Sequence, residues 1–179
     1  VYYIAQVDSL NTVNTKLVAE NEVVTQKYVE ASKTAEQLAA DKQVLAEKVS
    51  IAAQLDARNI VVTTLNQRER KATRLSKIAL IQFDFVIAKN NTTEPGNKTV
   101  YLRLMTPDDV VLQKKAADVF RYENRDIAYS SKRTVEYGGE DLPVTMYWTV
   151  GEVLQAGTYR ADIFADGHLI GTQTFTLGK

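Results

Sequence analysis

Glycine and proline are absent from the first 94 residues of the chain, whereas all eight glycines and all three prolines lie between Pro95 and Lys179. Both residue types interrupt helices and mark turns, so their absence leaves the first part free to form one long helix. The second part is rich in positions where the chain can turn. This distribution predicts a helical region followed by a region built of strands and turns.

A seven-residue apolar repeat runs through the helical region. With Leu10 placed at position d, the d positions of seven consecutive heptads are all apolar. Such a narrow stripe is typical of a coiled coil, whereas a helix that packs on a globular core usually shows a wider stripe. We therefore predict that residues 1–70 form a coiled-coil helix that assembles with further copies of the chain. The residues expected to carry oligomerisation occupy positions a and d: Leu10, Asn14, Leu17, Asn21, Val24, Tyr28, Leu38, Leu45 and Val49.

Polar side chains occupy several a positions, among them Asn14, Asn21 and Lys42. Paired asparagines can hydrogen-bond across a parallel two-stranded seam, which favours one register at a cost in stability. The pattern predicts a parallel homodimer. A trimer also accommodates polar a residues and remains an alternative.

The apolar repeat changes phase after Ala52, because Leu55 and Val62 restart an apolar row three residues out of step. A slip of this kind predicts local overwinding or the point where the helices part. The basic residues between positions 68 and 71 suit the negative pole of a helix C-terminus. We therefore expect the helix to end near residue 70.

From Thr73 onward the apolar residues recur at every second position, which is the period of a β-strand. The stretch from Thr73 to Lys179 holds about seven or eight short strands separated by polar turns, which fits an immunoglobulin-like antiparallel β-sandwich over residues 73–179. We expect the first two strands, near residues 75–87 and 99–104, to pair with each other. Asp166-Gly167 predicts a hairpin between the last two strands.

Tyr159 lies near the start of a late strand, two residues after Gly157. The segment Leu154-Gln155-Ala156-Gly157-Thr158-Tyr159 resembles the tyrosine corner of immunoglobulin-like sandwiches. In that motif the tyrosine hydroxyl is tied to the backbone a few residues upstream.

The order of these parts resembles envelope proteins of Bacteroidetes-like bacteria, which have a membrane-proximal helix, a coiled coil and a C-terminal immunoglobulin-like domain. The resemblance covers the architecture end to end. It implies a location in the bacterial cell envelope, in the periplasm, with membrane contact only through an N-terminal anchor that precedes Val1. It implies no activity and no functional residues. The segments that carry it are Val100-Tyr101-Leu102-Arg103-Leu104, Gly157-Thr158-Tyr159-Arg160 and Ala165-Asp166-Gly167-His168-Leu169-Ile170-Gly171.

Composition narrows the chemistry that the chain can perform. Lys and Arg total 22 and Asp and Glu total 22, so any contact with nucleic acid or an anionic membrane would have to be local. The lack of cysteine excludes disulfides and thiol chemistry. His168 is the only histidine, and we interpret it as a hairpin residue rather than a general base or metal ligand. We therefore predict no catalytic residues, no cofactor, no metal and no nucleic-acid partner.

Three further groups of residues have a functional reading beside a structural one. The acidic pairs Asp108-Asp109 and Glu140-Asp141 could join a calcium site, although acidic turn residues usually face solvent. Trp148 could line a binding groove with nearby tyrosines, although aromatic residues of strands are usually packed in the core. A basic group could bind anions, although a solvated collar at the helix end is the favoured reading; its members are Arg68, Arg70, Lys71, Arg74 and Lys77.

These features favour a non-enzymatic structural or scaffolding protein. In this interpretation a parallel coiled coil holds copies of the sandwich and presents them to a protein or glycan partner. The alternative is a carbohydrate- or peptide-binding module that the stalk makes bivalent. It would require some of Tyr129, Tyr137, Tyr147 and Trp148 to be exposed together. A hydrolase would require His168 to meet a carboxylate and a nucleophile.

Overall fold

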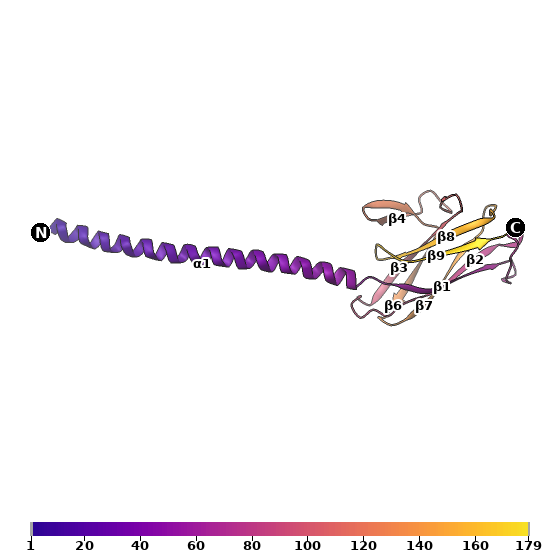
Figure 1. The fold of residues 1–179 in the computed structure, drawn as a ribbon, viewed down its shortest axis with the longest axis horizontal. Helices are drawn as coiled ribbons and strands as arrows, with labels where there is room; N and C mark the ends of the chain where they lie inside the picture. The colour runs from indigo at the N-terminus through magenta and orange to yellow at the C-terminus, as the bar shows by residue number, and fades with distance from the viewer. Residues whose placement is uncertain (1, 179) are drawn as a thin grey trace. The chain divides into compact units, whose positions relative to one another are not determined.

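A computed structural model describes residues 2–178 of the chain (Figure 1). The chain divides into two compact units, Val1–Val49 and Ser50–Lys179. The first unit is helical, and the second contains antiparallel sheets. The predicted order of a long N-terminal helix followed by antiparallel sheets is therefore confirmed.

Helix α1 spans Tyr2–Ala52 without interruption (Figure 1). Its 51 residues correspond to a length of about 76 Å at 1.5 Å per residue. The hydroxyl groups of Thr12, Thr15 and Thr34 each donate a hydrogen bond to the carbonyl group four residues earlier. These bonds give the hydroxyl groups a partner within the helix.

The prediction that the helix continues to residue 70 is wrong, because α1 ends at Ala52 and strand β1 spans Ala57–Leu65. The segment Ile60-Val61-Val62-Thr63-Thr64 is a run of β-branched residues, which favours a strand even though no glycine or proline precedes it. The phase slip marks this change from helix to strand. The boundary between the predicted domains 1–70 and 73–179 is therefore wrong, since β1 belongs to the second unit, Ser50–Lys179, which we call the β-unit.

Side chains of the loop at residues 88–95 satisfy carbonyl groups at the end of the helix. The Nδ2 group of Asn90 donates to the carbonyl oxygens of Ala52 and Gln54, at 2.8 and 2.9 Å. The hydroxyl of Thr93 donates to the carbonyl oxygen of Ala53 at 2.7 Å. The last carbonyl groups of a helix lack partners within the helix, so these bonds stabilise its end at this position.

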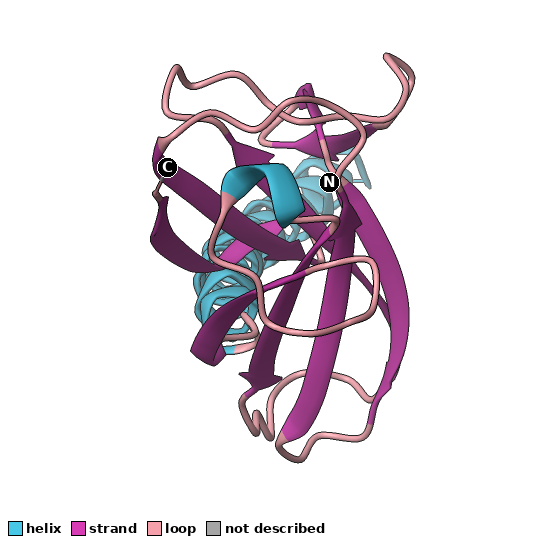
Figure 2. Ribbon diagram, turned by 90° about the vertical axis from the view of Figure 1, so that its right-hand side faces the viewer, coloured by secondary structure: helices cyan, strands magenta, loops and turns pink. Residues whose placement is uncertain are grey.

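Within residues 2–178 nine strands form two main sheets and one small hairpin, all with antiparallel pairing. Figures 1 and 2 show their arrangement. The first sheet has the order β1-β2-β7, with β2 at Leu80–Ile87 and β7 at Leu142–Thr149. The second has the order β6-β3-β8-β9. Its strands are β6 (Ser131–Tyr137), β3 (Gly96–Met105), β8 (Gly157–Ala165) and β9 (His168–Leu177). The hairpin pairs β4 (Val119–Tyr122) with β5 (Arg125–Ala128).

Two of the predicted strand features differ from the structure. The strands β2 and β3 lie in different sheets, so their predicted pairing is wrong. The stretch after Thr73 begins as a short 3-10 helix, Leu75–Lys77, and becomes a strand only at Leu80. The hairpin at Asp166-Gly167 is confirmed: both residues have positive φ, as a two-residue type I′ turn requires, and Ala165 pairs with His168.

Buried residues of both main sheets form one hydrophobic core. Phe83 of the first sheet and Leu102 and Ile163 of the second are fully buried members of it. At one side of the core Gly171 of β9 lies so close to β1 that an added Cβ would come within 2.9 Å of Ile60 and 3.0 Å of Ala57. The edge strands of the two sheets therefore meet closely there.

A second, smaller core is aromatic and lies beneath the β4–β5 hairpin. The rings of Phe120 and Tyr101 stack with their centroids 4.3 Å apart, and Phe164 meets Phe120 edge-on at 5.2 Å. Tyr129 completes the buried group. The hairpin thus covers the face of β3 and β8 that points away from the main core.

Strand register places three loops at one end of the β-unit. The end of β1 pairs with the start of β2, and the start of β2 pairs with the end of β7. The end of β3 pairs with the first part of β8. The loops at residues 66–79, 106–118 and 150–156 therefore share this end, which we call the loop end. The chain enters the β-unit from the opposite end, at residues 50–56.

Candidate functional site

All nine residues predicted to carry oligomerisation lie on α1 with exposed side chains. Residues seven positions apart are displaced by only about 20° around a helix, so these residues form one continuous stripe. Leu10 is 63 % exposed and Leu38 is 64 % exposed. Apolar surface of this extent is unfavourable in water, and a second helix with the same stripe would cover it.

Two valines beside the stripe were missed in the sequence analysis. Val13 and Val18 are exposed and occupy the g and e positions next to the a and d columns. They widen the stripe in the first half of the helix. An apolar residue at a flanking position of the heptad is the sequence signal that identifies each of them. A wider stripe has room for a third helix, as a trimeric coiled coil requires.

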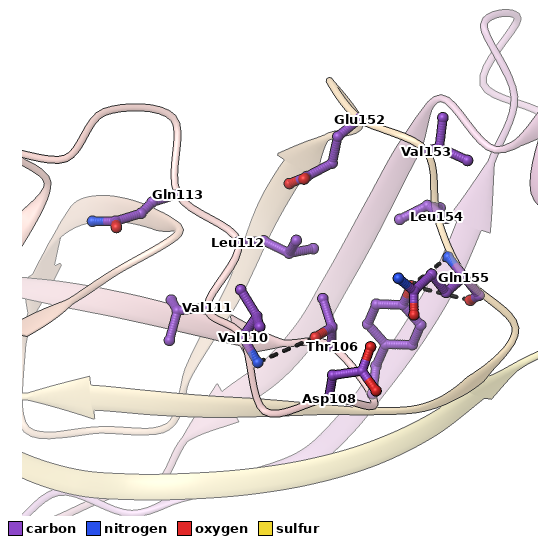
Figure 3. A pocket seen from close by; sticks show the side chains of 11 residues that line it. Thr106, Asp108, Val110, Val111, Leu112, Gln113, Glu152, Val153, Leu154 and Gln155 are labelled. Carbon is purple, nitrogen blue, oxygen red and sulfur yellow. Dashed lines mark hydrogen bonds between the residues drawn. The ribbon is translucent and has the colours of Figure 1, made fainter.

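A hollow of about 290 Å³ lies at the loop end, between residues 106–113 and 152–155 (Figure 3). Its polar walls include the carboxylates of Asp108 and Glu152, and its buried lining includes Leu112. The hydroxyl of Thr106 accepts a hydrogen bond from the backbone N–H of Val110 at 3.2 Å. The side chains that line this hollow include no histidine, cysteine or lysine, so it offers two carboxylates without a basic partner.

Tyr159 is among the residues that line this hollow, and its hydroxyl makes the hydrogen bonds to upstream backbone that the sequence pattern predicts. Its hydroxyl donates to the carbonyl oxygen of Gln155 at 3.1 Å and accepts from the N–H of Gln155 at 3.0 Å. Burial raises the pKa of Tyr159, the Gln155 hydrogen bond opposes that rise, and the charges of Glu152 and Asp108 add to it. The phenol therefore stays protonated at neutral pH and serves the loop as a structural donor.

His168 begins β9, where its Nδ1 lies 3.3 Å from Nε2 of Gln54. No ion pair or hydrogen bond among the described residues joins it to a carboxylate or a hydroxyl group. The structure therefore places His168 at the hairpin and does not bring it together with the partners that acid–base catalysis needs.

The two acidic pairs occupy different settings. Asp108-Asp109 is exposed in the loop after β3. Glu140 forms an ion pair with Lys89 at 2.7 Å, and Asp141 accepts a hydrogen bond from the N–H of Lys89 at 2.7 Å. Within residues 2–178 no three acidic or histidine side chains gather in a way that could hold a metal ion.

Three of the four aromatic residues considered for a binding groove are buried. Trp148 is 2 % exposed, and Tyr129 and Tyr137 are buried as well, whereas Tyr147 is 48 % exposed. The indole N–H of Trp148 has no hydrogen-bond partner among the described residues, and Nζ of Lys114 lies 5.5 Å from the ring centre. These four side chains therefore do not form a shared exposed surface.

The predicted basic collar does not lie at the end of a helix, because α1 ends far before it. Its five cations belong to the loop 66–79 between β1 and β2, at the loop end of the β-unit. All five side chains are exposed. The sequence interpretation found these residues but assigned them to the wrong structural element.

None of the curated proteins matches this chain. One similar solved structure is Pseudomonas fluorescens alkylpurine DNA glycosylase AlkC bound to DNA containing an abasic site analog, with 10% sequence identity and a TM-score of 0.41. The match covers 71% of this chain and 31% of the glycosylase, so the chain spans about a third of that protein. The expectations that this chain is no enzyme and has no nucleic-acid partner are contradicted by this finding and are not retained. A likeness of this low degree assigns neither an activity nor a ligand to the chain.

No helix in the described part of the chain combines the length and apolar character that a membrane span needs. Residues 1–43 match a family described as a coiled-coil region of unknown function (DUF8429). Residues 58–178, which make up most of the chain, match a family described as a domain of unknown function (DUF8428). The chain therefore belongs to the DUF8428 family.

Proposed function

We propose that the chain assembles through α1 as a parallel coiled coil and presents its β-unit, an immunoglobulin-like sandwich, to a binding partner. The observation that carries this proposal is the exposed heptad stripe of α1. The stripe keeps one register from Val7 to Ala52, which is the requirement for long-range pairing of helices.

The polar a positions support a parallel arrangement. In a parallel pair Asn14 and Asn21 each meet their own copy and can hydrogen-bond across the seam, whereas antiparallel pairing places them against other residues. Lys42 also meets its own copy, and its long stem allows the ammonium group to reach solvent. The match of residues 1–43 to a coiled-coil family supports the same arrangement.

Topology and one side-chain motif support the immunoglobulin-like assignment. Three strands in one antiparallel sheet and four in the other share one core, as in sandwiches of this class. The hydroxyl of Tyr159 binds upstream backbone at the start of the next-to-last strand, where the tyrosine corner of such sandwiches lies. The resemblance to envelope proteins supports a periplasmic location as part of the same proposal.

The mechanism of this function is spacing combined with avidity. Copies of the β-unit joined by one coiled coil bind a repetitive partner together, so weak individual contacts yield strong overall binding. Sedimentation equilibrium of the full chain tests the assembly step. We expect a mass of two or three chains for the native sequence.

Two double variants separate the stripe from other exposed apolar residues of α1. Leu38→Ser with Leu45→Ser changes two d positions, and we expect it to yield monomers. Val23→Ser with Val44→Ser changes two exposed positions outside the stripe and should leave the mass unchanged. A native chain that sediments as a monomer contradicts the proposal, and so does equal dissociation of both variants.

A further inference from the structure

The loop 66–79 concentrates positive charge on a chain whose total charge is zero. It carries five cations and one acidic residue, Glu69. None of the ion pairs between described residues involves these cations, and their side chains make no hydrogen bond within residues 2–178. The five are Arg68, Arg70, Lys71, Arg74 and Lys77. Unpaired cations at this density form a local site for anions.

The backbone of this loop is held in place by its own hydrogen bonds. The Oδ1 atom of Asn66 accepts from the N–H groups of Arg68 and Arg70, at 2.8 and 3.1 Å. The two arms are joined by the Thr64 hydroxyl, which donates to the carbonyl oxygen of Ala72 at 2.6 Å. The cations therefore project from an ordered turn, which reduces the entropy lost when they bind.

Arg68 and Lys77 line one shallow hollow of about 360 Å³ together with backbone and polar groups of the loop. An arginine fork and an ammonium group beside one hollow suit the oxygen atoms of a phosphate group. Glu69 is the one acidic residue within this loop. The other acidic residues of the loop end lie in the loops 106–118 and 150–156, where Asp108 and Glu152 border the hollow that Tyr159 also lines.

Exposed apolar residues accompany the cations at the loop end. Val153 is 93 % exposed in the loop 150–156, and Val110 is 59 % exposed in the loop 106–118. Apolar loop tips at the same end of the β-unit as a cationic loop favour binding to an anionic lipid surface, because the cations can meet the headgroups while the apolar side chains enter the acyl boundary. A partner that is a polymer of phosphate groups would gain no binding free energy from these valines.

We propose that the loop end of the β-unit, through the loop 66–79 and the exposed valines of the two other loops, docks onto an anionic phospholipid surface. This inference rests on the proposed function, because one basic loop binds weakly and the coiled coil supplies several copies. The chain then acts as a multivalent peripheral membrane contact made by its β-units.

Co-sedimentation of the full chain with vesicles tests this proposal. The probe is a vesicle of phosphatidylglycerol and phosphatidylcholine in about equal parts, at about 0.05 M salt, and pure phosphatidylcholine vesicles serve as the reference. We expect binding to the anionic vesicles alone and its loss at about 0.5 M salt. Arg70→Ala with Lys71→Ala should weaken binding by roughly tenfold to thirtyfold. Val153→Ser should weaken it further.

Arg121→Ala with Arg125→Ala is the matched control, since it removes the same charge from the β4–β5 hairpin and should leave binding unchanged. Failure to sediment with anionic vesicles overturns the proposal, as does equal loss in both double variants. Loop-dependent binding to duplex DNA without vesicle binding also overturns it, in favour of nucleic acid. Measuring the mass of the same samples separates the two proposals: an oligomer that ignores vesicles refutes only the lipid contact, and a monomer that binds them refutes only the assembly.

Discussion

The side-chain amide of Asn90 donates a hydrogen bond of 2.8 Å to the carbonyl oxygen of Ala52, the last residue of α1. The same amide group also donates to Gln54, while Oδ1 of Asn90 accepts from the N–H groups of Thr92 and Thr93. One side chain thus organises the β2–β3 loop and satisfies the end of the helix. From the sequence alone, Asn90 is indistinguishable from an ordinary polar loop residue.

We expect Asn90→Ala to lower the free energy of unfolding of the β-unit by about 1–3 kcal/mol, because several buried or capped backbone groups lose their partners. Urea unfolding followed by Trp148 fluorescence measures this loss. Asn91→Ala is the control, since Asn91 is exposed. Equal stability of the two variants would mean that water replaces the amide of Asn90 at no cost.

Tyr159→Phe removes a hydroxyl group that donates to and accepts from Gln155. The expected loss is about 1–2 kcal/mol of unfolding free energy, since the carbonyl and N–H groups of Gln155 lose a partner. Thermal unfolding measures the effect. Tyr147→Phe changes a half-exposed tyrosine on β7 and should leave the melting temperature within a degree or two. If Tyr159→Phe were as stable as the native chain, the hydrogen bonds of the Tyr159 hydroxyl would have no stabilising role.

The stability of the β-unit should also fall at alkaline pH. Burial raises the pKa of Tyr159 above its ordinary value of 10.0, so the folded state holds the phenolic proton more tightly than the unfolded chain. The stability from this group is fully present below pH 10 and is lost as the pH rises through the folded pKa. Urea midpoints between about pH 8 and 11 should decline less steeply in Tyr159→Phe than in the native chain. If the urea midpoints of both proteins declined equally, Tyr159 would not be the cause of the alkaline loss of stability.

Gly157 joins the loop end to β8 with a φ of +145°, and a Cβ atom there would lie 2.6 Å from Cγ of Pro107. Gly157→Ala therefore combines backbone strain with a steric clash, and we expect it to destabilise the β-unit by about 2–4 kcal/mol. Gly138→Ala is the matched control, because an added Cβ there meets nothing within 4 Å. Differential scanning calorimetry compares the two, and similar melting temperatures would refute the clash.

The asparagines of the stripe offer a test of register. Asn14→Val with Asn21→Val replaces buried polar atoms of the proposed seam with apolar ones. We expect a higher melting temperature of the helix together with a mixture of oligomeric states, measured by circular dichroism and sedimentation. An unchanged stoichiometry with lower stability would show that the asparagines do not specify the assembly.

Several features of this protein follow from the sequence by itself. The heptad stripe, the alternation along β2 and the Asp166-Gly167 hairpin depend on neighbours a few residues apart, so local pattern is sufficient to predict them. The tyrosine corner is also local, because Tyr159 and Gln155 are four residues apart. The residues of α1 that we predict to carry oligomerisation could be named for the same reason.

Only the tertiary structure decided where the helix ends and where the basic residues lie. The segment after Ala52 has no glycine or proline, yet Leu55 and Ala57 are buried in the core and β1 pairs with β2, so contacts distant in sequence outweigh the local absence of helix breakers. Pairing across the chain also separates β2 from β3 into different sheets. Long-range strand pairing determines which segments become loops, and local periodicity does not encode that pairing. The cations between residues 68 and 77 consequently lie in a loop at the end of the β-unit.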